Sequence, residues 1–144
     1  MIIRGFQKGD AASRAWYSPC GVYRYRLERV WAPGALLACI MLNPSTATEE
    51  RNDPTIERCE RRARALGFGG LSVVNLFAFR ATYPADLRRA ADPVGPGMWR
   101  RCKRWRWPPG WFCAAGARMA ICWGRAGWLR KICGVRGLRC IIWA

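Results

Sequence analysis

The chain has 144 residues, which is typical of one domain large enough to bury a hydrophobic core. It carries 25 basic and 9 acidic residues, a formal net charge of +16, and no histidine. Its eight cysteines form no Cys-x-x-Cys pair, which argues against a structural zinc site, and we predict no metal or cofactor. With no signal-peptide pattern and no apolar run long enough to span a bilayer, we expect a cytoplasmic protein with free thiols.

The charge is distributed unevenly along the chain. All nine acids and fourteen of the basic residues lie in residues 1–92, whereas the remaining 52 residues carry eleven Arg and Lys and no acid. Seven of the nine Trp also lie in that second part. Two different compositions therefore meet near residue 92.

The first predicted elements are two strands. Along residues 23–28 aromatic or apolar residues alternate with charged ones, which is typical of a strand with one buried face. This pattern predicts that Tyr23, Tyr25 and Leu27 share the buried face and that Arg24, Arg26 and Glu28 share the exposed one. After a turn at residues 32–34, the unbroken apolar run at residues 35–42 predicts a strand buried on both faces, as in the centre of a parallel sheet.

A helix is predicted to begin after Asp53, because Asp53 can cap it, Pro54 suits its first position, and Glu57 favours its positive end. Four residues at helical spacing form its apolar face: Ile56, Cys59, Ala63 and Leu66. A second buried strand follows at residues 71–77, and a second helix is predicted at Pro84. The order strand, helix, strand predicts a βαβ unit with parallel strands.

Beyond residue 96 neither strand nor helix periodicity persists. Residues 100–107 interleave Arg and Lys with Trp, a pattern that suits nucleic acid or an anionic membrane surface. The alternative is that this part of a GC-rich gene is read out of frame. When residues 97–144 are back-translated with one permitted set of codons and read again from the third nucleotide, acids and histidines reappear. The new reading also contains an amphipathic helix followed by an apolar strand. We therefore predict that residues 1–96 are the front half of a single α/β domain and residues 97–144 an out-of-frame tail, a hypothesis that sequencing the gene at codons 96–99 tests.

Several motifs resemble those of an uncharacterised bacterial and phage family, domain of unknown function 1643. They are Leu-Asn-Pro-Ser-Thr-Ala at 42–47, Asp-Pro-Thr-Ile at 53–56, Asn-Leu-Phe-Ala at 75–78, Arg-Ala-Thr at 80–82 and Asp-Pro-Val-Gly-Pro at 92–96. The resemblance covers residues 17–96. That family is distantly similar to the uracil-DNA glycosylase superfamily, which implies a three-layer α/β sandwich with a mainly parallel sheet, here incomplete at its C-terminus. The chain departs from that pattern, since it has no Trp-Gly-Ala-His-Gly and no His-Pro segment.

Ligands of open parallel sheets bind beyond the carboxyl ends of the strands, where residues 43–48 and 75–82 are expected. Asn43 offers a donor and an acceptor suited to a base edge or a water molecule, but its Asn-Pro-Ser sequence also fits a simple turn. Ser45 and Thr46 could bind phosphate oxygens, and Arg80 would add a charge-assisted contact.

Three further positions complete the predicted site. Asn75 and Thr82 are candidate ligand-binding residues, although Asn75 could instead tie its strand to a nearby loop. Asp53, with Asn43, is a weak candidate for catalysis by activating water, and a helix cap is the alternative role for Asp53.

These residues and the resemblance predict a domain directed at a nucleobase, a nucleotide or nucleic acid, inactive in this chain through truncation. The alternative is a module that binds nucleotide or nucleic acid without chemistry. The sequence does not decide whether the chain is an enzyme, and it gives no prediction of the oligomeric state.

Overall fold

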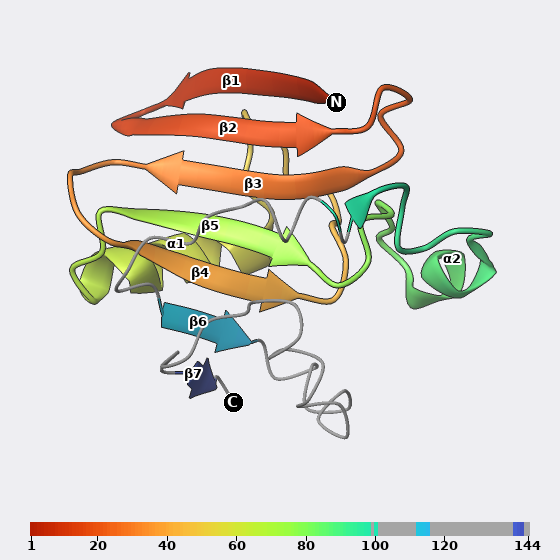
Figure 1. The fold of residues 1–144 in the computed structure, drawn as a ribbon. Helices are drawn as coiled ribbons and strands as arrows, with labels where there is room; N and C mark the ends of the chain where they lie inside the picture. The colour runs from red at the N-terminus through yellow and green to blue at the C-terminus, as the bar shows by residue number, and fades with distance from the viewer. Residues whose placement is uncertain (99, 101–111, 116–139, 143–144) are drawn as a thin grey trace.

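The computed structural model describes residues 1–98, 100, 112–115 and 140–142, which build one sheet with helices beside it (Figure 1). The strands are β1 (Ile2–Lys8), β2 (Ala11–Tyr17), β3 (Arg24–Val30), β4 (Leu36–Met41), β5 (Gly70–Asn75), β6 (Phe112–Ala115) and β7 (Cys140–Ile142). The helices are α1 (Pro54–Ala65) and α2 (Pro84–Arg89).

The sheet is mixed, with the described strands in the order β1-β2-β3-β5-β4-β6-β7. The pairs β1–β2, β2–β3 and β3–β5 are antiparallel, and the pairs β5–β4, β4–β6 and β6–β7 are parallel. The α/β class is therefore supported, but the prediction of a mainly parallel sheet is wrong. The reason is the N-terminal meander β1–β2–β3, whose tight links force neighbouring strands to run in opposite directions.

The predicted βαβ unit is confirmed, because β4 and β5 are parallel neighbours joined through α1. Helix α1 begins as the sequence predicts: Asp53 Oδ1 accepts hydrogen bonds from the backbone N–H groups of Thr55 (3.0 Å) and Ile56 (2.9 Å). Ile56 and Ala63 on its apolar face are buried, whereas Leu66 at its end is 48% exposed. The buried face of α1 packs on the sheet in one hydrophobic core with Leu37, Leu71 and other strand residues.

Strand β3 differs from its predicted form, because charged side chains are buried on it. Arg24, Glu28 and Arg29 are all at most 4% exposed. The register with β2 shifts at Tyr25, since Trp16 pairs with Arg26 but Tyr17 pairs with Arg24. Such an extra residue breaks the alternation of side chains between the two faces. The predicted half-buried strand is thus a central strand, flanked by β2 and β5.

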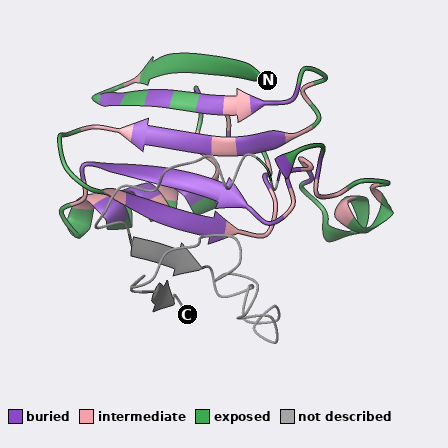
Figure 2. Cartoon of the chain, viewed as in Figure 1, coloured by how far each residue is buried: buried purple, intermediate pink, exposed green. Residues whose placement is uncertain are grey.

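Burial changes across the sheet (Figure 2). Strand β5 is buried at every position, whereas β1 at the edge is exposed from Ile2 to Gln7. A second, smaller cluster is formed by Tyr25, Ala78 and Met98. The core is therefore centred on β3, β5 and β4, the strands whose ends carry the candidate site.

The predicted sandwich had helices on both faces of the sheet. Among the described residues α1 supplies one helical layer, while α2 has no buried residue.

No helix in the described ranges is long and apolar enough to cross a membrane. The predicted out-of-frame tail at 97–144 lies for the most part outside the described residues. Within it the backbone of β6 and β7 extends the sheet beyond β4.

Candidate functional site

Three loops meet at the carboxyl ends of β4 and β5. They are residues 42–53 after β4, residues 76–83 after β5, and residues 18–23 between β2 and β3. The Ala81 N–H donates to the Pro44 carbonyl (2.9 Å), and the Arg80 N–H donates to the Val22 carbonyl (3.1 Å). Backbone hydrogen bonds thus fix residues 80 and 81 between the other two loops.

Asn43 joins two of these loops through its side chain. Its Nδ2 donates to the carbonyl of Pro44 (3.0 Å) and to the carbonyl of Ala81 (2.7 Å). Both amide protons are therefore engaged within the protein. In this arrangement Asn43 positions the loops, and its predicted contact with a ligand stays a prediction.

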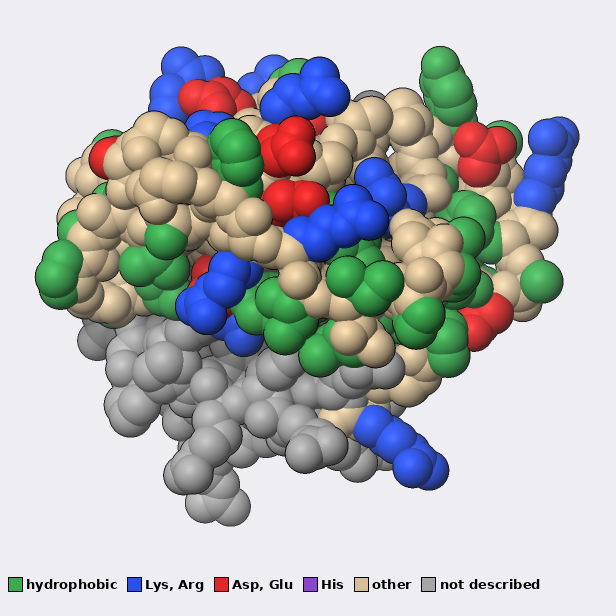
Figure 3. All heavy atoms as spheres, turned by 90° about the horizontal axis from the view of Figure 1, so that it is seen from above, with side chains coloured by type: hydrophobic (Ala, Val, Ile, Leu, Met, Phe, Trp, Pro, Cys, Tyr) green, Lys and Arg blue, Asp and Glu red, His purple; other side chains and the backbone are tan. Residues whose placement is uncertain are grey.

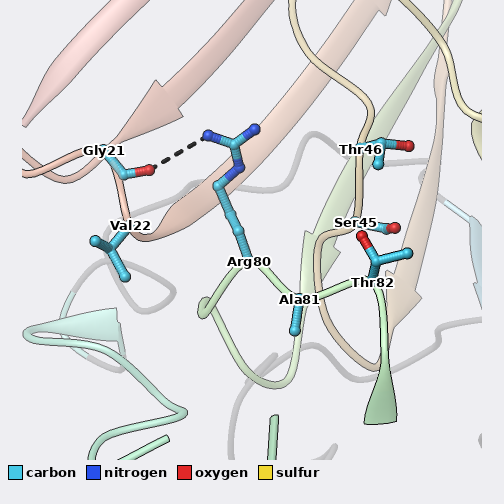
Figure 4. A pocket seen from close by; sticks show the side chains of 7 residues that line it. All are labelled: Gly21, Val22, Ser45, Thr46, Arg80, Ala81 and Thr82. Carbon is cyan, nitrogen blue, oxygen red and sulfur yellow. Dashed lines mark hydrogen bonds between the residues drawn. The ribbon is translucent and has the colours of Figure 1, made fainter. Parts of the chain in front are cut away.

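A pocket of about 460 Å³ opens between the loops (Figure 4). Its described lining consists of Gly21, Val22, Ser45, Thr46, Arg80, Ala81 and Thr82. The structure therefore brings together four of the residues predicted to bind a ligand, namely Ser45, Thr46, Arg80 and Thr82, whereas Asn43 and Asn75 do not line this pocket. The volume is within the usual range for small-molecule sites.

Arg80 supplies the charge of this lining. Its Nη1 donates to the Gly21 carbonyl (3.3 Å), as Figure 4 shows, and its guanidinium lies 5.5 Å from the centre of the Tyr17 ring. Its Nε is buried and has no hydrogen-bond partner among the described residues. The described lining includes no carboxylate, so Arg80 is not neutralised from within the pocket.

Asn75 ends β5 and is only 3% exposed. Neither its Nδ2 nor its Oδ1 has a hydrogen-bond partner in the described part of the chain. The predicted alternative, in which this amide ties β5 to a nearby loop, would require such a bond. Buried amides are nearly always hydrogen-bonded, so an unpaired one marks a place for a water molecule or a ligand.

Arg24 is one residue of this region that sequence reasoning missed. It is 2% exposed, its Nη1 donates to the Ala47 carbonyl, and its Nε has no described partner. Burial lowers the pKa of the Arg24 guanidinium to about 10; the charges of Tyr17 and Asp53 raise this pKa, and those of Arg80 and Arg29 lower it. Arg24, Arg29 and Arg80 therefore lie close enough together for their charges to act on one another. The alternating pattern predicted Arg24 on the exposed face, so the sequence did not indicate that Arg24 is buried beneath the loop.

Arg29 and Tyr17 hold the second half of the loop that follows β4. Arg29 Nη2 donates to the Thr48 carbonyl (2.6 Å) and to Asn52 Oδ1 (3.1 Å). The Tyr17 hydroxyl donates to Glu49 Oε2 (2.8 Å). Burial, together with this hydrogen bond, raises the pKa of Tyr17 to about 12, so its hydroxyl stays protonated and can donate at neutral pH.

The carboxylate of Asp53 is engaged as the cap of α1, as its two hydrogen bonds to the helix N-terminus show. Its predicted role in activating water is untested. Among the described residues no group of three or more His, Cys, Asp or Glu side chains is arranged to hold a metal ion.

The chain belongs to the family described as "Protein of unknown function (DUF1643)", whose model matches residues 24–132, more than half of the chain. This confirms the family resemblance seen in the motifs. The match continues past residue 97, so it marks no boundary there, and the out-of-frame tail stays a prediction. No curated protein sequence and no solved structure matches the chain.

Proposed function

We propose that this chain is a binding domain directed at a nucleotide, free or within a nucleic-acid strand, and that the pocket at Arg80 takes the phosphate. The hydroxyls of Ser45, Thr46 and Thr82 would donate to phosphate oxygens, and Arg80 would supply a charge-assisted hydrogen bond. The pocket volume of about 460 Å³ leaves room for more than a phosphate group.

One observation carries this proposal. The four buried side-chain atoms without a hydrogen-bond partner in the described ranges belong to Arg24, Asn75 and Arg80, and these residues lie around the loop that follows β4. Three of the four atoms are donors, two of them on guanidinium groups. Unpaired buried donors near the guanidinium of Arg80, beside which the described lining places no carboxylate, are satisfied best by an anion.

Asn75 is the candidate for recognition of the base, which would have to displace the loops that cover it, because Asn75 is buried and lies outside the pocket lining. An amide with both a free donor and a free acceptor complements the edge of a nucleobase, which carries donors and acceptors side by side. This part of the proposal rests on the unpaired amide of Asn75.

The described residues favour binding without chemistry over catalysis. Hydroxyls, one guanidinium and small side chains line the pocket, and none of these is an effective general base at neutral pH. The alternative is an enzyme that acts on a nucleobase, which the motif order resembling the uracil-DNA glycosylase superfamily suggests. Release of free base from modified DNA by the full chain would support that alternative.

Calorimetric titration of the full chain with a nucleoside monophosphate tests the proposal. We expect binding, and Arg80→Met is expected to weaken it by about tenfold or more, because a hydrogen bond to a charged group contributes about 1.5–3 kcal/mol and 1.4 kcal/mol is a factor of ten. Inorganic phosphate should compete, and a nucleoside without phosphate should bind more weakly than the monophosphate.

Arg58→Met is the matched control, because Arg58 is exposed on α1 and outside the pocket lining. It should leave the affinity unchanged, which separates a specific contact from general attraction to a basic chain. Absence of nucleotide binding, or equal losses in the Arg80 and Arg58 variants, would refute the proposal.

A further inference from the structure

Strand β1 is an edge strand that the described structure leaves open. It pairs with β2 on one side, and no described strand pairs with its other side. It is seven residues long, contains no proline, and is exposed at every position except Lys8, which is intermediate. Proteins normally protect such an edge, because its free N–H and C=O groups can pair with another chain.

The exposed hydrophobic side chains concentrate on this strand. Ile2 is 41% exposed, Ile3 55% and Phe6 47%, and Met1 just before the strand is 51% exposed. These are four of the seven large hydrophobic residues that are exposed in the described part of the chain. Figure 3, which looks down on this edge, shows hydrophobic, basic and acidic side chains interspersed on the surface.

The two cations of β1 are held within their own subunit. Arg4 Nη1 lies 3.8 Å from Glu49 Oε1, and its guanidinium lies 5.3 Å from the centre of the Tyr17 ring. Lys8 Nζ lies 3.7 Å from Glu60 Oε2. These contacts draw both charges toward the side of α1, so they do not shield the free backbone edge.

We propose that β1 pairs antiparallel with β1 of a second copy of this chain, so that two sheets join into one across a two-fold axis at Gly5. In this register residue i of one copy lies opposite residue 10 − i of the second copy. Arg4 then lies opposite Phe6, Ile2 opposite Lys8, and Ile3 opposite Gln7.

Among the registers open to a second copy, charge selects this one. An axis at Arg4 would place the two Arg4 guanidinium groups opposite each other, and an axis at Phe6 would place Arg4 opposite Lys8. Like charges directly opposite are unfavourable in antiparallel pairs. The axis at Gly5 avoids both conflicts, pairs all seven residues of β1, and places each Arg4 against an aromatic ring, which attracts cations.

Sedimentation velocity over a range of concentrations tests the pairing with the full chain. We expect a monomer–dimer equilibrium that shifts to monomer on dilution, because a single edge pairing is a small interface. Phe6→Lys is expected to weaken the dimer by about tenfold or more, since it places a second cation opposite Arg4 in two symmetric positions and removes the exposed ring.

Phe6→Glu is the matched variant, because it removes the same ring but places an anion opposite Arg4. It should dimerise clearly more tightly than Phe6→Lys. Thermal unfolding should show that both variants fold, since the Phe6 side chain is nearly half exposed. A wild-type chain that stays monomeric at all concentrations, or Lys and Glu variants with equal dimer affinities, would overturn the proposal.

Discussion

Replacing Arg29 with Ala is expected to lower the free energy of unfolding by about 3–5 kcal/mol, a large part of the roughly 5–15 kcal/mol that stabilises a typical domain. Arg29 is 0% exposed, and its guanidinium donates to Ser13 Oγ, the Thr48 carbonyl and Asn52 Oδ1. The truncation leaves these acceptors unpaired and opens a cavity beneath the loop that follows β4. Urea unfolding followed by circular dichroism measures the change.

Two further variants separate the causes of this loss. Arg29→Met keeps much of the buried volume but none of the donors, so the destabilisation that remains reports the unpaired acceptors. Arg58→Ala removes an exposed arginine of α1 and should change stability by less than about 0.5 kcal/mol. If Arg29→Ala behaved like Arg58→Ala, the buried position of Arg29 would be wrong.

Gly69→Ala is the second change for which we expect a large loss, about 3 kcal/mol or more, measured by the same unfolding experiment. A Cβ on Gly69 would lie 2.9 Å from both the carbonyl carbon and the carbonyl oxygen of Pro33, and closer still to the Ala32 carbonyl. These are backbone atoms, which cannot turn away as a side chain can. The Gly69 carbonyl also accepts hydrogen bonds from the N–H groups of Trp31 and Ala32, 3.0 Å each, so the segments cannot separate without losing them.

Gly5→Ala is the matched glycine control for this experiment. A Cβ there would meet no atom closer than the Ser13 carbonyl oxygen at 3.8 Å. The variant should therefore unfold within about 0.5 kcal/mol of the wild type. Equal stabilities of the Gly69 and Gly5 variants would show that residues 32 and 33 do not approach Gly69 in solution.

The βαβ unit could be predicted from the sequence because its signals are local. Asp53 and Pro54 specify the start of α1, and the apolar runs on either side are long enough to indicate buried strands. The N-terminal meander gave no comparable signal. Residues 1–8 mix Ile and Phe with Arg, Gln and Lys and follow no clean alternation. They lie at an exposed edge, where burial imposes no pattern on the side chains.

The sequence predicted correctly which loops form the candidate site, but it predicted the roles of their individual residues less well. Ser45, Thr46, Arg80 and Thr82 share a pocket because the strands that precede their loops are parallel neighbours. The buried Arg24 was assigned to the wrong face, because a single register shift at Tyr25 is invisible in a short alternating pattern. Contacts such as that of Asn43 with Ala81 depend on residues far apart in the chain and could not be predicted from spacing.

The position of β3 between β2 and β5 has a consequence for folding during synthesis. Its pairing with β2 joins nearby residues and can form early, but its other edge pairs with residues 70–74, for example Val30 with Gly70. That edge stays open while the ribosome adds residues 31–69, and contacts between distant residues form slowly. The strand that carries Arg24 and Arg29 is therefore closed late, and the time needed to translate residues 31–74 sets how long this edge can pair with another nascent chain.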